Sequence, residues 1–182
     1  RIIEFTTETL AGIPSIIYGL FGMIFFVVFL KWDYSLMAGA ATAAIMVLPT
    51  ILSTTKEALD AVPDSYREGS FALGTGKLRT IFKVVLPAAV PGILSGIILA
   101  IGRIVGETAA LLYTSGTATR GLSKGLMSSG RTLAVHMYTI SSEGFHTKQT
   151  FATAVILLVF VFIINTLSSV AAKQISKKAG GQ

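Results

Sequence analysis

The sequence contains no cysteine, and this absence excludes disulfide bonds and thiolate metal sites. It is also poor in charge: only 13% of its 182 residues are Asp, Glu, Lys or Arg, whereas soluble domains average about 25%. Such sparse charge does not cover the surface of an ordinary soluble domain. Instead 52% of the residues are hydrophobic and the mean hydropathy is +0.73. The composition therefore predicts an integral membrane protein.

The net charge of +6 does not indicate nucleic-acid binding. The basic residues gather at the ends of apolar segments and in the connections between them, which is the distribution that membrane orientation produces. The chain begins at Arg1 inside a polar segment and lacks the pattern of a signal peptide. We expect that an N-terminal part of the native protein precedes this sequence.

Four apolar stretches are expected to cross the membrane as helices of one domain covering residues 1–182, namely 14–30, 35–52, 87–113 and 150–172. Residues 1–13 are expected to form an interfacial lead-in. Pro49 falls in the last turn of the second span and should bend or end it. The sequence thus predicts an all-α, polytopic membrane helical bundle.

A polar loop at residues 53–86 and a polar connection at 114–149 join these spans. With four spans, Arg1, the polar loop and the C-terminal tail lie on one side of the membrane, which also carries most of the Lys and Arg residues. The positive-inside rule makes this side cytoplasmic and the connection at 114–149 extracytoplasmic.

Within the polar loop, Pro63 and Asp64 suit the start of a helix, and Gly74 and Gly76 should end that helix. A shorter basic helix is expected from Lys77 to Leu86. The run Gly74-Thr75-Gly76-Lys77 is not a nucleotide-binding loop. A Walker A motif needs Gly and Ser or Thr where this chain has Phe71 and Leu78.

The polar loop resembles the EAA loop of ABC-transporter permease subunits, which reads Glu-Ala-Ala, three residues, Gly, nine residues, Ile, one residue, Leu-Pro. Here the corresponding positions are Glu68-Gly69-Ser70, Gly74, Val84 and Leu86-Pro87, with the small residues Gly69 and Ser70 in place of the Ala-Ala pair. The resemblance implies that the loop forms coupling helices that dock on a separate ATPase subunit. The residues expected to carry this role are Arg67, Glu68, Gly69, Ser70, Gly74, Leu86 and Pro87. The alternative is a solvated loop between two spans.

The third span carries its only charges at Arg103 and Glu107, whose i,i+4 spacing puts them on one face if the helix continues. A charge inside the bilayer is costly and indicates function by default. One interpretation is an ion pair that neutralises itself. The other is an anion site, in which the Arg103 guanidinium binds an oxyanion. Glu107 then holds Arg103 in place, or accepts a hydrogen bond from a protonated oxyanion.

The run from Arg103 to Thr114 resembles the phosphate-permease branch of these transporters, and its PstA-like subunits in particular. Residues 12–15 and 18–22 resemble the same subunits. The resemblance implies a type I ABC importer permease with the MetI-like fold, and a substrate pathway that includes Arg103, Gly106, Glu107 and Thr108.

The same resemblance implies a multi-pass protein of a prokaryotic inner membrane that is not itself an enzyme. The implied partners are a second, PstC-like permease subunit, an ATPase dimer, an extracytoplasmic phosphate-binding protein and membrane lipid. No cofactor is expected in this chain, and ATP and Mg²⁺ are expected to be used by the partner ATPase.

Two other functions stay open. One is a permease for a different solute, such as molybdate or sulfate, and the other is an ATP-independent channel or carrier. Among the remaining polar residues, Asn165 is expected to join two helices by a hydrogen bond. His136 and His146 lack the spacing of metal ligands. The basic residues of the extracytoplasmic connection are either solvated or attract anions and a binding protein; they are Arg120, Lys124 and Arg131.

Overall fold

A computed structural model describes residues 2–118, 125–144 and 146–180, and every regular element in these ranges is a helix. The predicted all-α fold is confirmed. The elements are α1 (Ile2–Ala11), α2 (Ser15–Gly22), the π-helix η1 (Met23–Phe29), α3 (Leu36–Asp60), α4 (Asp64–Ala72), α5 (Lys77–Thr80), the π-helix η2 (Ile81–Val85), α6 (Leu86–Val105), α7 (Ala109–Leu112), α8 (Leu133–Ser142) and α9 (Thr147–Gly180).

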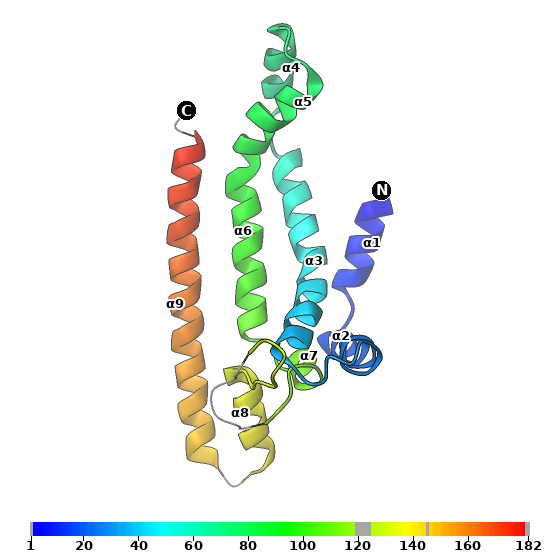
Figure 1. The fold of residues 1–182 in the computed structure, drawn as a ribbon. Coiled ribbons are helices and arrows are strands. Elements are labelled where there is room, and N and C mark those ends of the chain that lie inside the picture. Colours follow the sequence, from blue (N-terminus) through cyan, green and yellow to red (C-terminus); the bar gives the residue numbers. More distant parts are fainter. Residues whose placement is uncertain (1, 119–124, 145, 181–182) are drawn as a thin grey trace.

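Three helical stretches of the described chain are long and apolar enough to cross a membrane by themselves: 36–60, 77–105 and 147–175. Figure 1 shows them side by side, with α6 between α3 and α9. The start of α1, the helices α4 and α5, and the end of α9 lie at one end of this bundle, and α7 and α8 lie at the other (Figure 1). This arrangement agrees with the predicted topology, in which the polar loop and the C-terminal tail share one side of the membrane.

The N-terminal region differs from the expected straight span over 14–30. The helical stretch 15–29 is bent by 92° from α1, and its fifteen residues reach only about 22 Å at 1.5 Å per residue, short of the ~30 Å hydrocarbon core. In Figure 1, α1 runs beside α3 whereas α2 is seen nearly end-on. Residues 2–11 are therefore helix packed on α3 rather than an interfacial lead-in, and the two helices together form a broken span or a re-entrant loop.

Local chemistry accounts for this corner. Pro14 cannot continue α1, because it has no N–H and disfavours helical geometry in the residue before it. It stands instead at the N-cap of α2. The hydroxyl of the buried Tyr18 then donates a hydrogen bond to the carbonyl of Leu10 at 2.7 Å, which holds the end of α1 against the start of α2.

Helix α3 also differs from the prediction, because it continues past Pro49 to Asp60. Pro49 is buried inside the helix, and residues 53–60 of the polar loop form its last two turns. At its other end Ser35 is the N-cap residue, and its hydroxyl accepts a hydrogen bond from the Ala38 N–H at 3.2 Å. The helix is therefore seven to eight residues longer than the expected span, and it carries the membrane part of the bundle directly into the polar loop.

Small residues allow α6 to pack closely on both of its neighbours. A Cβ atom placed on Gly92 would lie 2.6 Å from Ala58 Cβ, and one on Gly96 would collide with the Thr54 side chain, so both glycines face α3. A Cβ on Gly102 would lie 3.1 Å from the Asn165 side chain of α9. This small-xxx-small spacing is the packing that helices use in lipid, where apolar burial alone does not drive association.

Candidate functional site

The polar loop folds into a compact turn of two helices at one end of the bundle. Pro63 is the N-cap of α4, and Gly74 turns the chain after it with φ of +75°, a conformation that glycine adopts without strain. The buried hydroxyls of Ser70 and Thr80 lie 2.9 Å apart and join α4 to α5 by a hydrogen bond. The predicted helix start at Pro63 and the predicted turn at Gly74 are confirmed.

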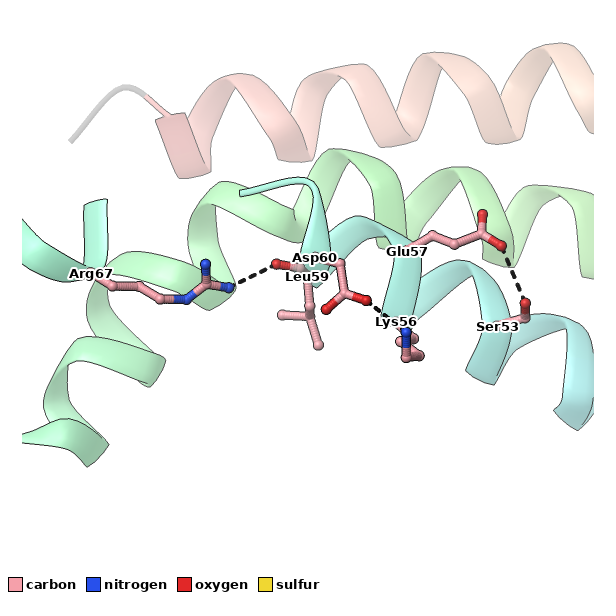
Figure 2. A network of polar contacts seen from close by, with 6 residues as sticks. All are labelled: Ser53, Lys56, Glu57, Leu59, Asp60 and Arg67. Carbon is pink, nitrogen blue, oxygen red and sulfur yellow. Dashed lines mark hydrogen bonds and ion pairs between the residues drawn. The ribbon is translucent and has the colours of Figure 1, made fainter. Parts of the chain in front are cut away.

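Arg67 fastens this turn to the end of α3. Its guanidinium donates hydrogen bonds to the carbonyls of Leu59 and Val62, both at 3.0 Å, and to the Asp64 carboxylate at 2.7 Å. Figure 2 shows Arg67 reaching the Leu59 carbonyl in the last turn of α3. A cation at a helix C-terminus also interacts favourably with the helix dipole. Arg67 is thus bonded within the chain, a role that the motif spacing did not reveal.

Glu68 and Gly69 occupy the exposed side of α4. Glu68 forms no hydrogen bond or ion pair within the described residues, and a Cβ on Gly69 would meet open space. The apolar side chains of Leu73 and Leu78 are 86% and 72% exposed at the tip of the turn. Beside them, α4 and α5–η2 enclose an open groove of about 670 Å³. This end of the molecule therefore presents a carboxylate and apolar surface together.

Leu86 and Pro87 do not mark a break between the helices of the polar loop and α6. Helices α5, η2 and α6 follow one another without a break, and Pro87 lies in the first turn of α6. The result is a single helical stretch from Lys77 to Val105, about 42 Å long at 1.5 Å per residue, that links the polar loop to the far end of the bundle.

Arg103 and Glu107 are not arranged as their spacing predicts. Helix α6 ends at Val105, so Glu107 lies beyond it and no longer shares a helical face with Arg103. Arg103 is exposed, and no ion pair joins the two residues in the described part of the chain. The interpretation of a self-neutralised pair loses its geometric basis, because the two charges point to different surroundings.

Glu107 is buried, with 9% of its surface exposed. Its carboxylate accepts a hydrogen bond from the Ala110 backbone N–H at 3.0 Å and so caps the short helix α7. Ala110 is itself fully buried, and a Cβ on Gly19 of α2 would lie 2.8 Å from its Cα. Glu107 therefore fixes the start of α7, beside the place where α7 packs on α2, rather than facing an open pathway.

The two other predicted pathway residues lie in the same α6–α7 junction. Gly106 is the exposed C-cap of α6, and Thr108 is the half-buried N-cap of α7. The hydroxyl of Thr108 is 3.5 Å from the Gly106 carbonyl, which is a weak contact. The junction thus places Arg103 and Gly106 on an accessible surface, with Glu107 turned inward.

Arg103 stands on a face of α6 that neither neighbouring helix covers. Its helical neighbours Ser95 and Leu99 and the adjoining Gly106 are exposed as well. Helix α3 packs on one side of this face through Gly92 and Gly96, and α9 packs on the other through Gly102. The small residues expected beside Arg103 thus serve mainly the contact between helices, while Arg103 itself is accessible and forms no ion pair within the described part of the chain.

The remaining polar residues add no metal site. No group of three or more His, Asp or Glu side chains able to hold a metal ion occurs among the described residues. His136 is half-buried in α8 and His146 is exposed. Arg131 is half-buried, whereas Arg120 and Lys124 lie outside the described residues, so the predicted role of that basic connection stays a prediction.

Known proteins resemble this chain along nearly its whole length. The family model described as "Binding-protein-dependent transport system inner membrane component" matches residues 1–180. The chain also superposes on a chain of the MetNI methionine ABC transporter in an inward-facing conformation, with a TM-score of 0.72 at 19% identity. That match covers 93% of this chain and 72% of the other, and at this identity it shows the fold alone.

Curated relatives are more similar in sequence. A probable ABC transporter permease protein, YqgI of Bacillus subtilis, is 36% identical over 75% of this chain and 51% of its own length. The phosphate transport system permease protein PstA of Yersinia pestis is 38% identical over 93% and 58%. PstA 1 of Mycobacterium tuberculosis is 43% identical over 64% and 38%. The chain thus spans between about two fifths and three fifths of the length of these three relatives.

Proposed function

We propose that this chain, which belongs to the family of binding-protein-dependent transport system inner membrane components, is a permease subunit of an ATP-driven phosphate importer. Its relatives in Yersinia pestis and Mycobacterium tuberculosis are named as phosphate permeases, and they support phosphate as the substrate. The observation that carries the proposal is Arg103, a guanidinium that stands on the open face of α6 with no ion pair to another described residue. A guanidinium is a strong ligand for phosphate-type oxyanions.

The turn of α4 and α5 is proposed to dock on a separate ATPase dimer. Glu68 offers a carboxylate that can pair with a cation of the partner, and the exposed Leu73 and Leu78 offer apolar surface to bury. Arg67 and the Ser70–Thr80 contact hold this turn to α3 and α5. A push from the ATPase is therefore passed to the bundle through fixed contacts rather than absorbed by the loop.

The same push is proposed to reach the anion site through the helical stretch 77–105. Because Arg103 lies near the outer end of this stretch and Glu68 docks near its inner end, a tilt of one helix moves both. The open face of α6 is proposed to be closed by a second, PstC-like permease subunit, so that this chain forms half of the pathway. ATP and Mg²⁺ belong to the ATPase in this scheme.

The bacterial relatives support a location of the assembly in a prokaryotic inner membrane, where an extracytoplasmic phosphate-binding protein would deliver the substrate. The test is reconstitution of the native protein with its permease, ATPase and binding-protein partners in vesicles. Phosphate uptake should require ATP and the binding protein. Uptake that persists without ATP would instead indicate a channel or carrier, and uptake of molybdate or sulfate in preference to phosphate would indicate another oxyanion permease.

A further inference from the structure

The open groove between α4 and α5–η2 carries charge of one sign. Arg79 of α5 and Lys83 of η2 both line it, and no acidic residue of the described chain does. Both residues are exposed, and neither forms an ion pair or hydrogen bond with another described residue. Two cations at i,i+4 spacing repel each other and slightly destabilise a helix. The fold therefore keeps two positive charges at one groove without neutralising them.

The wall that faces these cations is apolar or carries hydroxyl groups. Tyr66, Ser70 and Leu73 line it, from α4 and the residue that follows α4. The groove volume of about 670 Å³ falls within the range of ligand pockets, about 300–1,000 Å³, so the groove has room for side chains of a partner. Glu68 does not line it. The turn of α4 and α5 thus presents positive charge inside the groove and negative charge outside it.

The contacts between α3 and α6 show where the groove lies relative to the membrane. Helix α3 carries its first charge at Lys56, which marks the inner edge of its apolar part. Gly96 of α6 packs against Thr54, two residues before this lysine, and Gly92 packs against Ala58, two residues after it. The level of Lys56 therefore falls between the two glycines, near residue 94 of α6.

The two cations lie well beyond this level. Lys83 is eleven residues from residue 94 along the helical stretch 77–105, which is roughly 16 Å at 1.5 Å per residue. Arg79 is one turn further. The headgroup layer on each side of a bilayer is only about 5–8 Å thick. The groove therefore stands in the aqueous phase, where a soluble protein reaches it and lipid headgroups do not.

The rim of the groove indicates a protein rather than a free anion as its occupant. Leu73, Leu78 and Phe82 are 86%, 72% and 63% exposed. A small anion would satisfy the cations but leave this apolar surface in water. Exposed apolar side chains around a charged groove are typical of a surface that a protein partner covers. The complementary partner carries carboxylates together with apolar side chains.

Resting on the proposed function, we infer that this groove receives an acidic segment of the partner ATPase, whose carboxylates bind Arg79 and Lys83 while an apolar side chain packs between Tyr66 and Leu73. Glu68 pairs with a cation of the same ATPase outside the groove. The turn thus offers its partner two charges of opposite sign in a fixed order. The reversed orientation would bring like charges together and is excluded.

The first test measures binding of the purified partner ATPase to the native permease pair in nanodiscs, once with zwitterionic lipid alone and once with anionic lipid added. R79Q/K83Q should lower the ATPase affinity about 10- to 100-fold in both lipids and weaken its dependence on salt. K77Q/K173Q is the matched control, because it removes the same charge at two exposed lysines that do not line the groove. It should change the affinity by less than about twofold.

The second test identifies the acidic segment directly. A carbodiimide joins a lysine amine and a carboxylate that are in contact, by an amide bond with loss of water. Mass spectrometry of the treated complex should find Lys83 joined to an Asp or Glu of the ATPase. K83R keeps the positive charge, so it should retain the ATPase affinity and lose this cross-link.

The outcomes separate the two proposals. Normal ATPase affinity in R79Q/K83Q, or an equal loss in K77Q/K173Q, overturns the role of the groove alone. A loss that appears only with anionic lipid makes a headgroup the occupant and also overturns it. If R79Q/K83Q fails to assemble, the absence of a cross-link from Lys83 to the ATPase in the wild type overturns it instead. Absence of ATP-dependent phosphate uptake by a wild-type complex that binds the ATPase overturns the proposed function.

Discussion

An arginine and a glutamate that are close together in sequence lie near each end of the helical stretch 77–105. At one end the arginine is bonded within the chain and the glutamate is exposed, and at the other end the reverse holds. At the α4–α5 end, Arg67 is bonded to carbonyls of the chain and Glu68 is exposed. At the α6–α7 end, Glu107 is buried and bonded to a backbone N–H, and Arg103 is exposed. Each end thus has one structural charge and one accessible charge.

The difference between the ends lies in the sign of the accessible charge. A carboxylate set beside exposed apolar side chains suits a protein partner that supplies a cation. A guanidinium on an open face of small residues suits an oxyanion that must bind and then leave. The internally bonded members, Arg67 and Glu107, hold the backbone that presents the accessible ones. The following variants change these charged residues one at a time.

The largest effect is expected at Arg103. R103Q removes the charge and the forked donors, so ATP-dependent phosphate uptake should fall about 100-fold or more while the assembled complex still purifies intact. R103K keeps the charge and should retain partial uptake. Uptake in proteoliposomes, with size-exclusion chromatography of the complex, measures both. Normal uptake by R103Q would remove the anion site from α6.

Glu68 is expected to matter next, through the ATPase. E68K reverses the accessible charge, and stimulation of ATP hydrolysis by the loaded binding protein should fall about 10-fold, since one charge-assisted hydrogen bond contributes about 1.5–3 kcal/mol. The matched control is E57K, which makes the same charge change at an exposed carboxylate of α3 that contacts the Ser53 hydroxyl at 3.3 Å (Figure 2). Equal losses in both variants would assign the effect to net charge alone.

These two ends also differ in how well the sequence predicts them. The turn of the polar loop follows from local chemistry, because Pro63 starts a helix and Gly74 adopts a positive φ whatever surrounds them. The i,i+4 pairing of Arg103 and Glu107 assumes that α6 continues, but the helix ends at Val105 where α7 turns inward to pack on Gly19. That end is set by tertiary contact, which spacing does not encode.

Tertiary contact also explains the other differences between the predicted and the observed structure. The helical stretch 15–29 lies across the bundle because glycines on it fit closely against α3 and α7, although its apolar composition alone resembles a span. Pro49 is tolerated inside α3, where packing outweighs a lost backbone hydrogen bond. The expected interhelical hydrogen bond of Asn165 likewise depends on which residue of α6 it meets: its Oδ1 atom faces Gly102 and has no hydrogen-bond partner among the described residues.

A smaller effect is expected from the structural arginine. R67M removes three hydrogen bonds, which join Arg67 to Leu59 in the last turn of α3, to Val62 in the connection and to Asp64 within α4. The loop should lose about 1–3 kcal/mol of local stability, reduced by the partial exposure of this side chain. Hydrogen–deuterium exchange over residues 62–75 measures the loss. D60N breaks only the exposed pair with Lys56 and should change exchange there by less than about twofold.

The smallest effect is expected at Glu107, where the variants test most directly whether the two ends differ in the way described. A glutamine keeps an oxygen that can accept from the Ala110 N–H, so E107Q should retain both phosphate uptake and slow amide exchange in residues 109–115. E107A removes the cap, which costs about 0.5–2 kcal/mol, and exchange in this segment should rise about 2- to 30-fold. A loss of uptake in E107Q with unchanged exchange would mean that the pathway needs the negative charge itself. In that case both charges at the α6–α7 end would act on the substrate, and the division into one structural and one accessible charge would hold only at the α4–α5 end.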